Sequence, residues 1–149
     1  MTVKESLYKQ CSDFVESRLQ TVQRTINEIQ EALTTETKST AGDKHETGRA
    51  MLQLEREKAG NQLAEIQKLK EILSKIDITK QSNHIGLGSV VYTTKANYFL
   101  AVSAGEIVYN NQHFFAISPN TPIGKLLLGN TVGATVKFRT QEFEITEIL

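Results

Sequence analysis

Apolar side chains recur along the first half of the chain at the spacing of an α-helix. The first series comprises Leu7, Cys11, Phe14, Arg18, Val22, Ile26, Ile29 and Leu33, with Arg18 as its one charged interruption. The second series has an apolar residue at every seventh position: Leu52, Ala59, Ile66 and Leu73. Such spacing places one apolar stripe on each helix and leaves the other faces to water. We therefore predict two long amphipathic helices that pack against each other.

The stretch from Thr34 to Gly42 separates the two series and has no apolar period. It contains four threonines and one serine, which are poor helix formers. We predict a connection here, and hence an antiparallel helical hairpin, or coiled coil, over residues 1–78 with an acidic tip at 42–46. Each arm of roughly 30 residues would be about 45 Å long at 1.5 Å per residue.

The composition of the chain changes near residue 80. Residues 1–80 carry 13 basic and 13 acidic side chains, whereas residues 81–149 carry four of each and both prolines. The second part contains short runs rich in β-branched and aromatic residues, separated by turn residues. We predict strands at 90–92, 98–102, 106–109, 113–117, 135–138 and 142–149, and one short helix at 122–128. The predicted fold class is α+β, with a helical hairpin over 1–78, a linker over 79–83 and a small α+β domain over 84–149.

Charge and cysteine content exclude several classes of protein. Basic and acidic residues number 17 each, which argues against a nucleic-acid binder that works through bulk positive charge. With Cys11 as the single cysteine, neither an intrachain disulfide nor a cysteine-rich zinc site can form. No apolar run has the length of a membrane span, and the first residues lack a signal-peptide core. We expect a soluble, cytoplasmic protein without a membrane partner.

No familiar catalytic motif occurs in the sequence. There is no nucleophile elbow and no phosphate-binding loop, and the Gly-Leu-Gly segment at 86–88 lacks the third glycine of a dinucleotide site. Cys11 lies on an apolar stripe, where we expect a small buried hydrophobe rather than a nucleophile. His84 and His113 have no carboxylate or thiol at ligand spacing, so we expect no chemical role for either histidine.

One group of candidate functional residues remains, at the predicted tip of the hairpin. Asp43 and Glu46 have the spacing of a capping box, in which both side chains would hydrogen-bond to amides at the start of the second helix. Alternatively, the two carboxylates complete a Mg²⁺ site of a partner, because Mg²⁺ takes only one or two protein carboxylates besides water and phosphate oxygens. Spacing alone leaves both interpretations open.

The sequence of the predicted tip is Gly42-Asp43-x-x-Glu46, and three later segments have the appearance of family motifs. They are Val-Ser-Ala-Gly-Glu-Ile at 102–107, Ala-Ile-Ser-Pro-Asn-Thr-Pro-Ile-Gly-Lys-Leu-Leu-Leu-Gly at 116–129, and Val-Gly-Ala-Thr-Val at 132–136. With these segments, the whole chain resembles the bacterial Gre family of transcript-cleavage elongation factors. The resemblance implies that the second domain is FKBP-like and docks on RNA polymerase. It also implies that the hairpin enters the secondary channel of the polymerase.

The resemblance further implies roles for particular residues. Asp43 and Glu46 would complete a Mg²⁺ site shared with the polymerase, for two-metal hydrolysis of backtracked RNA near its 3′ end. The chain would be a monomeric accessory factor, neither an enzyme by itself nor a metal binder in isolation. Contacts to RNA or polymerase near the tip would come from Lys38, Lys44, Arg49 and Arg56, although such charges also suit a solvated helix face. Docking on the polymerase would use Ser103, Gly105, Glu106, Ser118, Pro119, Pro122 and Ile123.

After the tip, the sequence departs from the family pattern. Members of the family continue Asn-Ala-Glu-Tyr, whereas this chain has Thr47-Gly48-Arg49-Ala50. The change favours a second hypothesis, a regulator that occupies the secondary channel without promoting cleavage. A third hypothesis, from a different class, is an interaction module in which the FKBP-like domain binds the partner and the hairpin serves as an arm.

Overall fold

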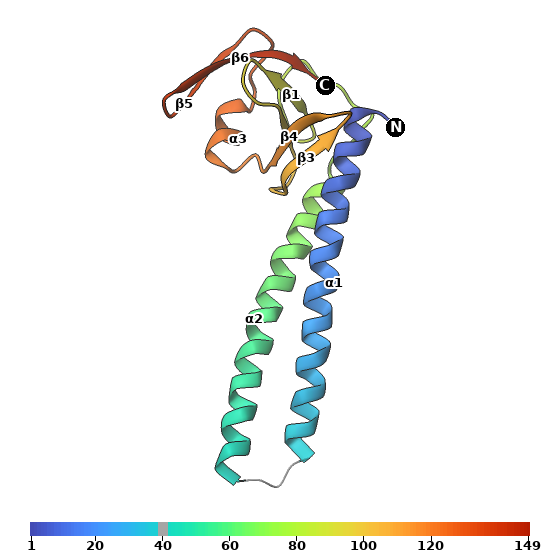
Figure 1. The fold of residues 1–149 in the computed structure, drawn as a ribbon, viewed down its shortest axis with the longest axis vertical. Coiled ribbons are helices and arrows are strands. Elements are labelled where there is room, and N and C mark those ends of the chain that lie inside the picture. Colours follow the sequence, from blue (N-terminus) through green and yellow to red (C-terminus); the bar gives the residue numbers. More distant parts are fainter. Residues whose placement is uncertain (39–41) are drawn as a thin grey trace. The chain divides into compact units, whose positions relative to one another are not determined.

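Two long helices form the N-terminal part of the chain. The computed structural model describes the backbone of residues 1–38 and 42–149, and the side chains of residues 1–35 and 47–149. Helix α1 covers Val3–Lys38 and helix α2 covers Gly42–Ser74, and the two run antiparallel, side by side (Figure 1). Their 36 and 33 residues correspond to about 54 Å and 50 Å of helix. The predicted pair of long helices is confirmed.

The buried stripe of α1 differs in one turn from the predicted series. Val15 and Leu19 are buried, whereas Phe14 is 37% exposed and Arg18 is exposed. The prediction of Phe14 and Arg18 as stripe positions is therefore wrong. With Val15 and Leu19 in their place, the apolar residues form two interleaved series with a period of seven, which are Val15, Val22 and Ile29, and Leu19, Ile26 and Leu33. The stripe is continuous and has no charged interruption.

The stripe of α2 lies at the predicted positions. Ala59, Ile66 and Leu73 are buried. Ala59 lines the same small pocket as Ile29 of α1, so the two stripes face each other there.

The predicted connection between the helices is too long. Helix α1 continues to Lys38, and only residues 39–41 separate it from α2. The hydroxyl of Thr34 donates to the carbonyl of Gln30 at 3.0 Å, and that of Thr35 to the carbonyl of Glu31 at 3.1 Å. Their hydroxyls thus bond within the helix, and a weak helix propensity does not end it there.

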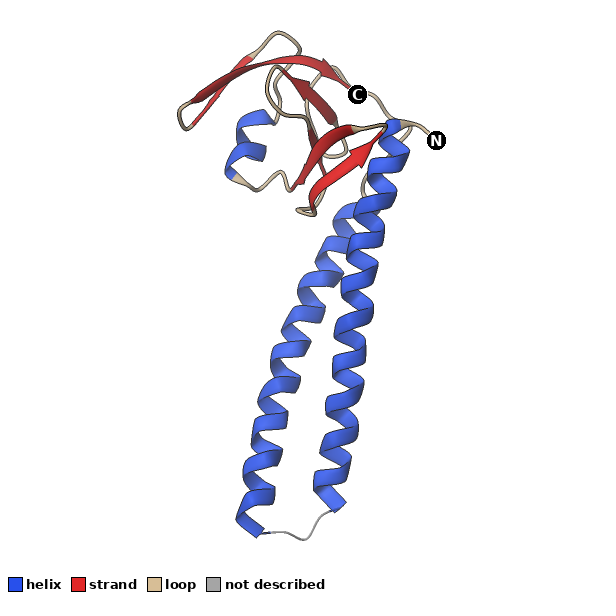
Figure 2. Ribbon diagram, viewed as in Figure 1, coloured by secondary structure: helices blue, strands red, loops and turns tan. Residues whose placement is uncertain are grey.

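A six-stranded mixed sheet follows the helices (Figure 2). Its strands are β1 (Val90–Thr93), β2 (Tyr98–Leu100), β3 (Gly105–Tyr109), β4 (Gln112–Ile117), β5 (Thr135–Phe138) and β6 (Gln141–Ile148), and α3 covers Pro122–Leu127. The strand order is β3-β4-β2-β1-β6-β5, with β2 and β4 parallel and the other neighbours antiparallel. Each predicted strand and the short helix are present within a few residues of their expected bounds. The α+β class is confirmed.

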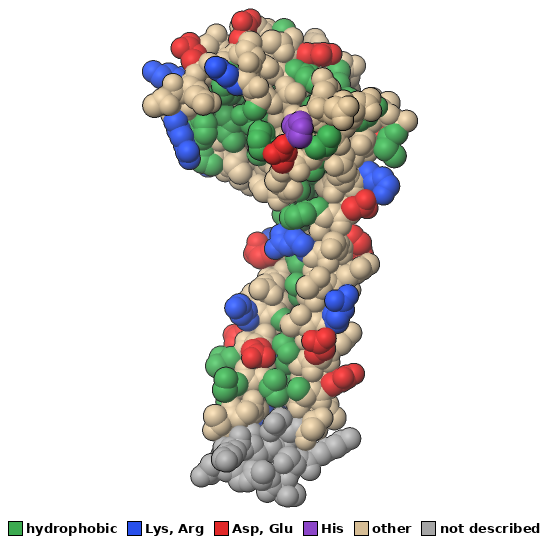
Figure 3. Space-filling view, viewed as in Figure 1, with side chains coloured by type: hydrophobic (Ala, Val, Ile, Leu, Met, Phe, Trp, Pro, Cys, Tyr) green, Lys and Arg blue, Asp and Glu red, His purple; other side chains and the backbone are tan. Residues whose placement is uncertain are grey.

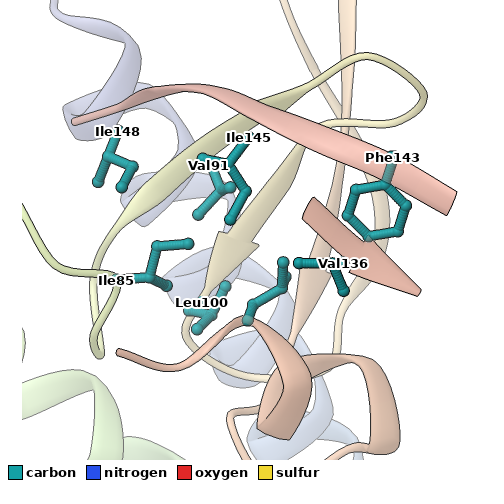
Figure 4. Packing of buried hydrophobic residues seen from close by; sticks show 8 residues of the cluster. Ile85, Val91, Leu100, Val136, Phe143, Ile145 and Ile148 are labelled. Atoms are coloured by element: carbon teal, nitrogen blue, oxygen red, sulfur yellow. The ribbon is translucent and has the colours of Figure 1, made fainter. Parts of the chain in front are cut away.

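One face of the sheet packs on α3 to form the core. The cluster comprises Ile85, Val91, Leu100, Leu127, Val136, Phe143, Ile145 and Ile148, all buried. The labelled side chains come from β1, β2, β5, β6 and the segment before β1, and they point into a common interior (Figure 4). On β6, buried residues at 143 and 145 alternate with exposed ones, as expected for a strand with one face on the core.

By internal contacts the chain divides into two compact units. The sheet unit contains residues 1–14 and 70–149, and the hairpin unit contains residues 15–69. Within the sheet unit, the side-chain amide of Gln10 donates to the carbonyl of Val108 at 2.9 Å, and the hydroxyl of Tyr109 donates to the carbonyl of Met1 at 2.9 Å. The first turns of α1 therefore belong with the sheet. No helix in the described residues is both long and apolar enough to cross a lipid bilayer.

Candidate functional site

The predicted acidic tip lies at the start of α2. Because α2 begins at Gly42, Asp43 lies in its first turn and Glu46 follows at the start of the second. The side chains of residues 36–46 are outside the described residues, and the roles predicted for Asp43, Glu46, Lys38 and Lys44 lie there with them. Immediately after the tip, Thr47 is exposed, whereas Gly48 and Arg49 are half-buried.

Arg56, the other basic residue predicted near the tip, lies along its own helix. Its guanidinium group occupies the space beside Gly60, where an added Cβ would lie 3.1 Å from Nη1 of Arg56. On the face drawn in Figure 3, acidic and basic side chains are interspersed along the hairpin unit. One such pair is Lys68 and Glu65, at 3.3 Å. Interspersed charges attract a polyanion less than a single-sign patch does.

A tight hairpin joins β3 and β4 and determines which of their side chains are neighbours. Asn110 and Asn111 both have positive φ, 49° and 65°, as a two-residue type I′ turn requires. The turn pairs Tyr109 with Gln112, and further along the ladder it pairs Glu106 with Phe115. The register therefore brings the outward-facing residues of the two strands onto one exposed face.

That exposed face carries a histidine–carboxylate pair. Nδ1 of His113 is hydrogen-bonded to Oε1 of Glu106. Spacing along the chain did not indicate this contact, because the pairing of β3 with β4 joins residues that are seven apart in sequence, and the lack of a chemical role for His113 stays a prediction. Val108 and Phe115, which are 43% and 41% exposed, lie on the same face. Exposed apolar side chains rimmed by polar ones are typical of a protein-binding surface.

Four of the predicted docking residues lie in the loop before α3 or in its first turn: Ser118, Pro119, Pro122 and Ile123. The amide of Ser118 donates to Oγ of Ser103 at 3.2 Å, which ties the end of β4 to the segment after β2. The Thr121 hydroxyl donates to the carbonyl of Ser118 at 2.8 Å and accepts from the amide of Gly124 at 3.1 Å. Thr121 is therefore the N-cap of α3, with Pro122 in the first turn.

The exposure of the predicted docking residues varies. Ser103, Gly105, Glu106 and Pro122 are exposed, whereas Ser118, Pro119 and Ile123 are half-buried. Gly105 has φ of +74°, a conformation that glycine adopts without strain. The predicted docking residues lie in this loop, at the start of α3 and around the start of β3, and their role in docking stays a prediction. Val108, Phe115 and His113 were not among them, because their common face depends on the register.

A second feature missed by the sequence analysis is a polar cavity of about 420 Å³ in the sheet unit. It is lined by Lys4, Lys75, Asp77, Lys80, Ser82, His84, Gly86, Leu87 and Ser89. Lys4 is buried, and its ammonium group donates to the carbonyl of Lys80 at 2.7 Å. Burial lowers the pKa of Lys4, and the negative charge of Asp77 opposes that shift. The lining residues come from distant segments, so no spacing in the sequence indicates the cavity.

Cys11 is buried, as predicted, and burial raises the pKa of its thiol to about 12. Such a thiol is protonated at neutral pH and is a poor nucleophile.

Among the described residues, no group of three or more His, Cys, Asp and Glu side chains is placed to hold a metal ion. No protein-family model matches the chain, and no curated protein matches it.

Proposed function

We propose that this protein is an accessory factor of bacterial RNA polymerase that promotes hydrolysis of backtracked RNA. In this proposal, the hairpin enters the secondary channel and an FKBP-like domain docks on the polymerase. The observation that carries the proposal is the order of parts: a pair of long N-terminal helices, Gly-Asp-x-x-Glu at the start of the second helix, and then a six-stranded sheet. That order and motif agree with the Gre resemblance.

Asp43 and Glu46 have the donor chemistry that the proposal needs. Both are carboxylates, and Asp43 lies in the first turn of a helix, where the helix dipole favours negative charge. Two carboxylates suit Mg²⁺ but do not build a complete site, so the polymerase would supply the other ligands. Asp43 and Glu46 would bind at that site and orient the attacking water toward the RNA phosphate. The ion, when bound, supplies electrostatic stabilisation of the reacting oxygens.

Docking would use the exposed face of the β3–β4 hairpin with the neighbouring loop before α3. Phe115 and Val108 provide apolar contact area, and Glu106 with His113 provides polar groups beside it. Interfaces of this composition derive most of their affinity from a few aromatic or charged residues.

The segment after the tip favours one alternative, a regulator that occupies the channel without promoting cleavage. Gly48 lies in the second turn of α2, where glycine is about 1 kcal/mol less favourable than alanine. The same segment, Thr47-Gly48-Arg49-Ala50, lacks the aromatic residue that the Gre pattern has at its end. The alternative keeps polymerase binding and removes hydrolysis.

RNA cleavage in a stalled, backtracked complex of the cognate polymerase tests the proposal. The test variant is Asp43→Asn with Glu46→Gln. The control is Asp13→Asn with Glu16→Gln, because this pair in α1 has the same residue types and the same spacing. We expect shortened transcripts with the native protein and the control, and at least about tenfold slower cleavage with the tip variant.

Binding measurements on the same proteins separate the hypotheses. Binding without cleavage by any of the three proteins would support the channel regulator. Failure of the native protein to bind the polymerase would contradict both channel hypotheses and leave the interaction module. A further variant, Phe115→Ala, should weaken polymerase binding by about tenfold, whereas Val132→Ala, at a residue that is 57% exposed, should leave binding unchanged.

A further inference from the structure

We propose that the cavity lined by Lys4, Lys75 and Lys80 in the sheet unit binds a small molecule through its phosphate or diphosphate group. The cavity volume of about 420 Å³ falls within the range of small-molecule sites. Its walls come from the start of α1, the segment that follows α2 and the turn before β1. The inference concerns the free protein and does not depend on the polymerase.

The buried residue Lys4, whose side chain lines the cavity, is the first observation behind this inference. Lys4 is 9% exposed, and its ammonium donates one hydrogen bond, to the carbonyl of Lys80 at 2.7 Å. An ammonium group has three N–H donors. Among the described residues, the other two donors of Lys4 have no hydrogen-bond acceptor. The negative charge of Asp77 offsets only part of the cost of burying Lys4, so an anion in the cavity would stabilise this residue further.

The charges on the cavity wall are the second observation. Three lysines and one carboxylate, that of Asp77, line the cavity. The negative charge of Asp77 attracts Lys4 and Lys80, and its Oδ1 accepts from the amide of Thr79 at 2.9 Å and from the hydroxyl of Thr79 at 2.6 Å, which leaves one negative against three positive charges. Lys75 has only a loose contact with Glu71, at 3.8 Å between exposed side chains. The wall therefore keeps a net positive charge.

Two serine hydroxyls on the wall complete a set of donors for a tetrahedral anion. Oγ of Ser89 accepts from the amide of Gly86 at 3.0 Å, and Oγ of Ser82 accepts from the amide of His84 at 3.2 Å. Each hydroxyl accepts a hydrogen bond and still has its own proton to donate. Several ammonium and hydroxyl donors around one cavity suit a phosphate, which presents three or more acceptor oxygens, better than a carboxylate with two.

Calorimetric titration of the full-length protein with inorganic diphosphate, at low salt and without Mg²⁺, tests the inference. The test variants are Lys75→Gln and Lys80→Gln, both at exposed side chains, so that folding is retained. Lys137→Gln, at an exposed lysine of β5, is the control for the loss of one charge. We expect saturable binding that each test variant weakens by about tenfold and the control leaves within about twofold, because each test variant removes a charge-assisted hydrogen bond.

The results of this titration separate a phosphate site in the cavity from nonspecific binding of anions. Absence of saturable binding, or equal weakening by the control, would overturn the inference. Titration with adenosine diphosphate and with a short single-stranded oligonucleotide distinguishes the source of the phosphate. Tighter binding of the oligonucleotide, lost in Lys75→Gln and Lys80→Gln, would assign the cavity to a nucleic-acid backbone and refute the small-molecule assignment. Tighter binding of the diphosphates, with amide signals of residues 86–89 shifting in NMR spectra, would support it.

Discussion

Replacing Gly124 with alanine tests whether packing in the loop before α3 outweighs the general preference of helices for alanine. An alanine in place of a helical glycine usually stabilises the helix by about 1 kcal/mol. At Gly124 we expect the opposite. A Cβ there would lie 2.4 Å from the carbonyl oxygen of Ser118, 2.8 Å from Oγ1 of Thr121 and 3.0 Å from Cα of Pro119. Such distances require the neighbouring atoms to move.

The atoms next to Gly124 cannot move without weakening the hydrogen bonds of the N-cap of α3. The Thr121 hydroxyl bonds both the carbonyl of Ser118 and the amide of Gly124, so its displacement removes the N-cap, worth about 1 kcal/mol. Overpacking against backbone adds about 1–3 kcal/mol. After subtraction of the gain in helix propensity, we expect the free energy of unfolding to fall by about 1–3 kcal/mol.

Urea unfolding followed by near-ultraviolet circular dichroism measures this change. The four tyrosines of the chain all lie in the sheet unit, so the signal reports that unit. Gly60→Ala in α2 is the matched control, because its Cβ would meet only the end of the flexible Arg56 side chain. By far-ultraviolet circular dichroism, Gly60→Ala should be stabilised by up to about 1 kcal/mol. If Gly124→Ala were at least as stable as the native protein, the packing explanation would be refuted.

Two further predictions concern Cys11 and the turn between β3 and β4. Because burial raises the pKa of the Cys11 thiol to about 12, we expect iodoacetamide to alkylate Cys11 of the native protein slowly. Alkylation as fast as in a urea-unfolded sample would contradict this expectation. This folded-state pKa lies above the ordinary thiol value of 9.0, so the contribution of the thiol to stability is complete below pH 9 and is lost as the pH rises toward 12. Asn111 has φ of 65°, a left-handed backbone conformation that valine adopts only with strain and glycine adopts freely. Asn111→Val should therefore destabilise the sheet unit by about 1–2 kcal/mol, whereas Asn111→Gly should not. Equal urea midpoints for the two variants would contradict the left-handed conformation of this residue.

The strands and the short helix of the sheet unit were predictable because the residue types that determine them are neighbours in the sequence. Val90–Thr93 and Thr135–Phe138 are short β-branched and aromatic runs between turn residues, and both became strands at nearly the expected bounds. The helix at Pro122–Leu127 was indicated by proline at its start and glycine shortly after its end. In each case the residues next to one another in sequence decide the backbone conformation.

The features that sequence analysis missed depend on contacts between distant segments. Phe14 and Val15 are both one helical turn from Cys11, and only the position of the packing partner decides which of them is buried. The contact of His113 with Glu106 follows from the register that the Asn110–Asn111 turn imposes. The lysine cavity draws residues from the start of α1, from the segment after α2 and from the turn before β1. None of these arrangements has a spacing that can be recognised along the chain.

The segment that carries much of the Gre resemblance has a structural explanation of its own. In Ser-Pro-Asn-Thr-Pro-Ile-Gly at 118–124, Thr121 caps α3, Pro122 starts it and Gly124 fits where a Cβ would not. A chain that builds this loop needs these residues for stability, whatever it binds. Phe115, in contrast, is 41% exposed. Under the proposed function, Phe115→Ala should weaken polymerase binding by more than its loss of stability explains, because the ring is partly exposed and also packs on Tyr98. Any loss of binding in Gly124→Ala should instead follow its loss of stability, so only the first pattern identifies a docking surface.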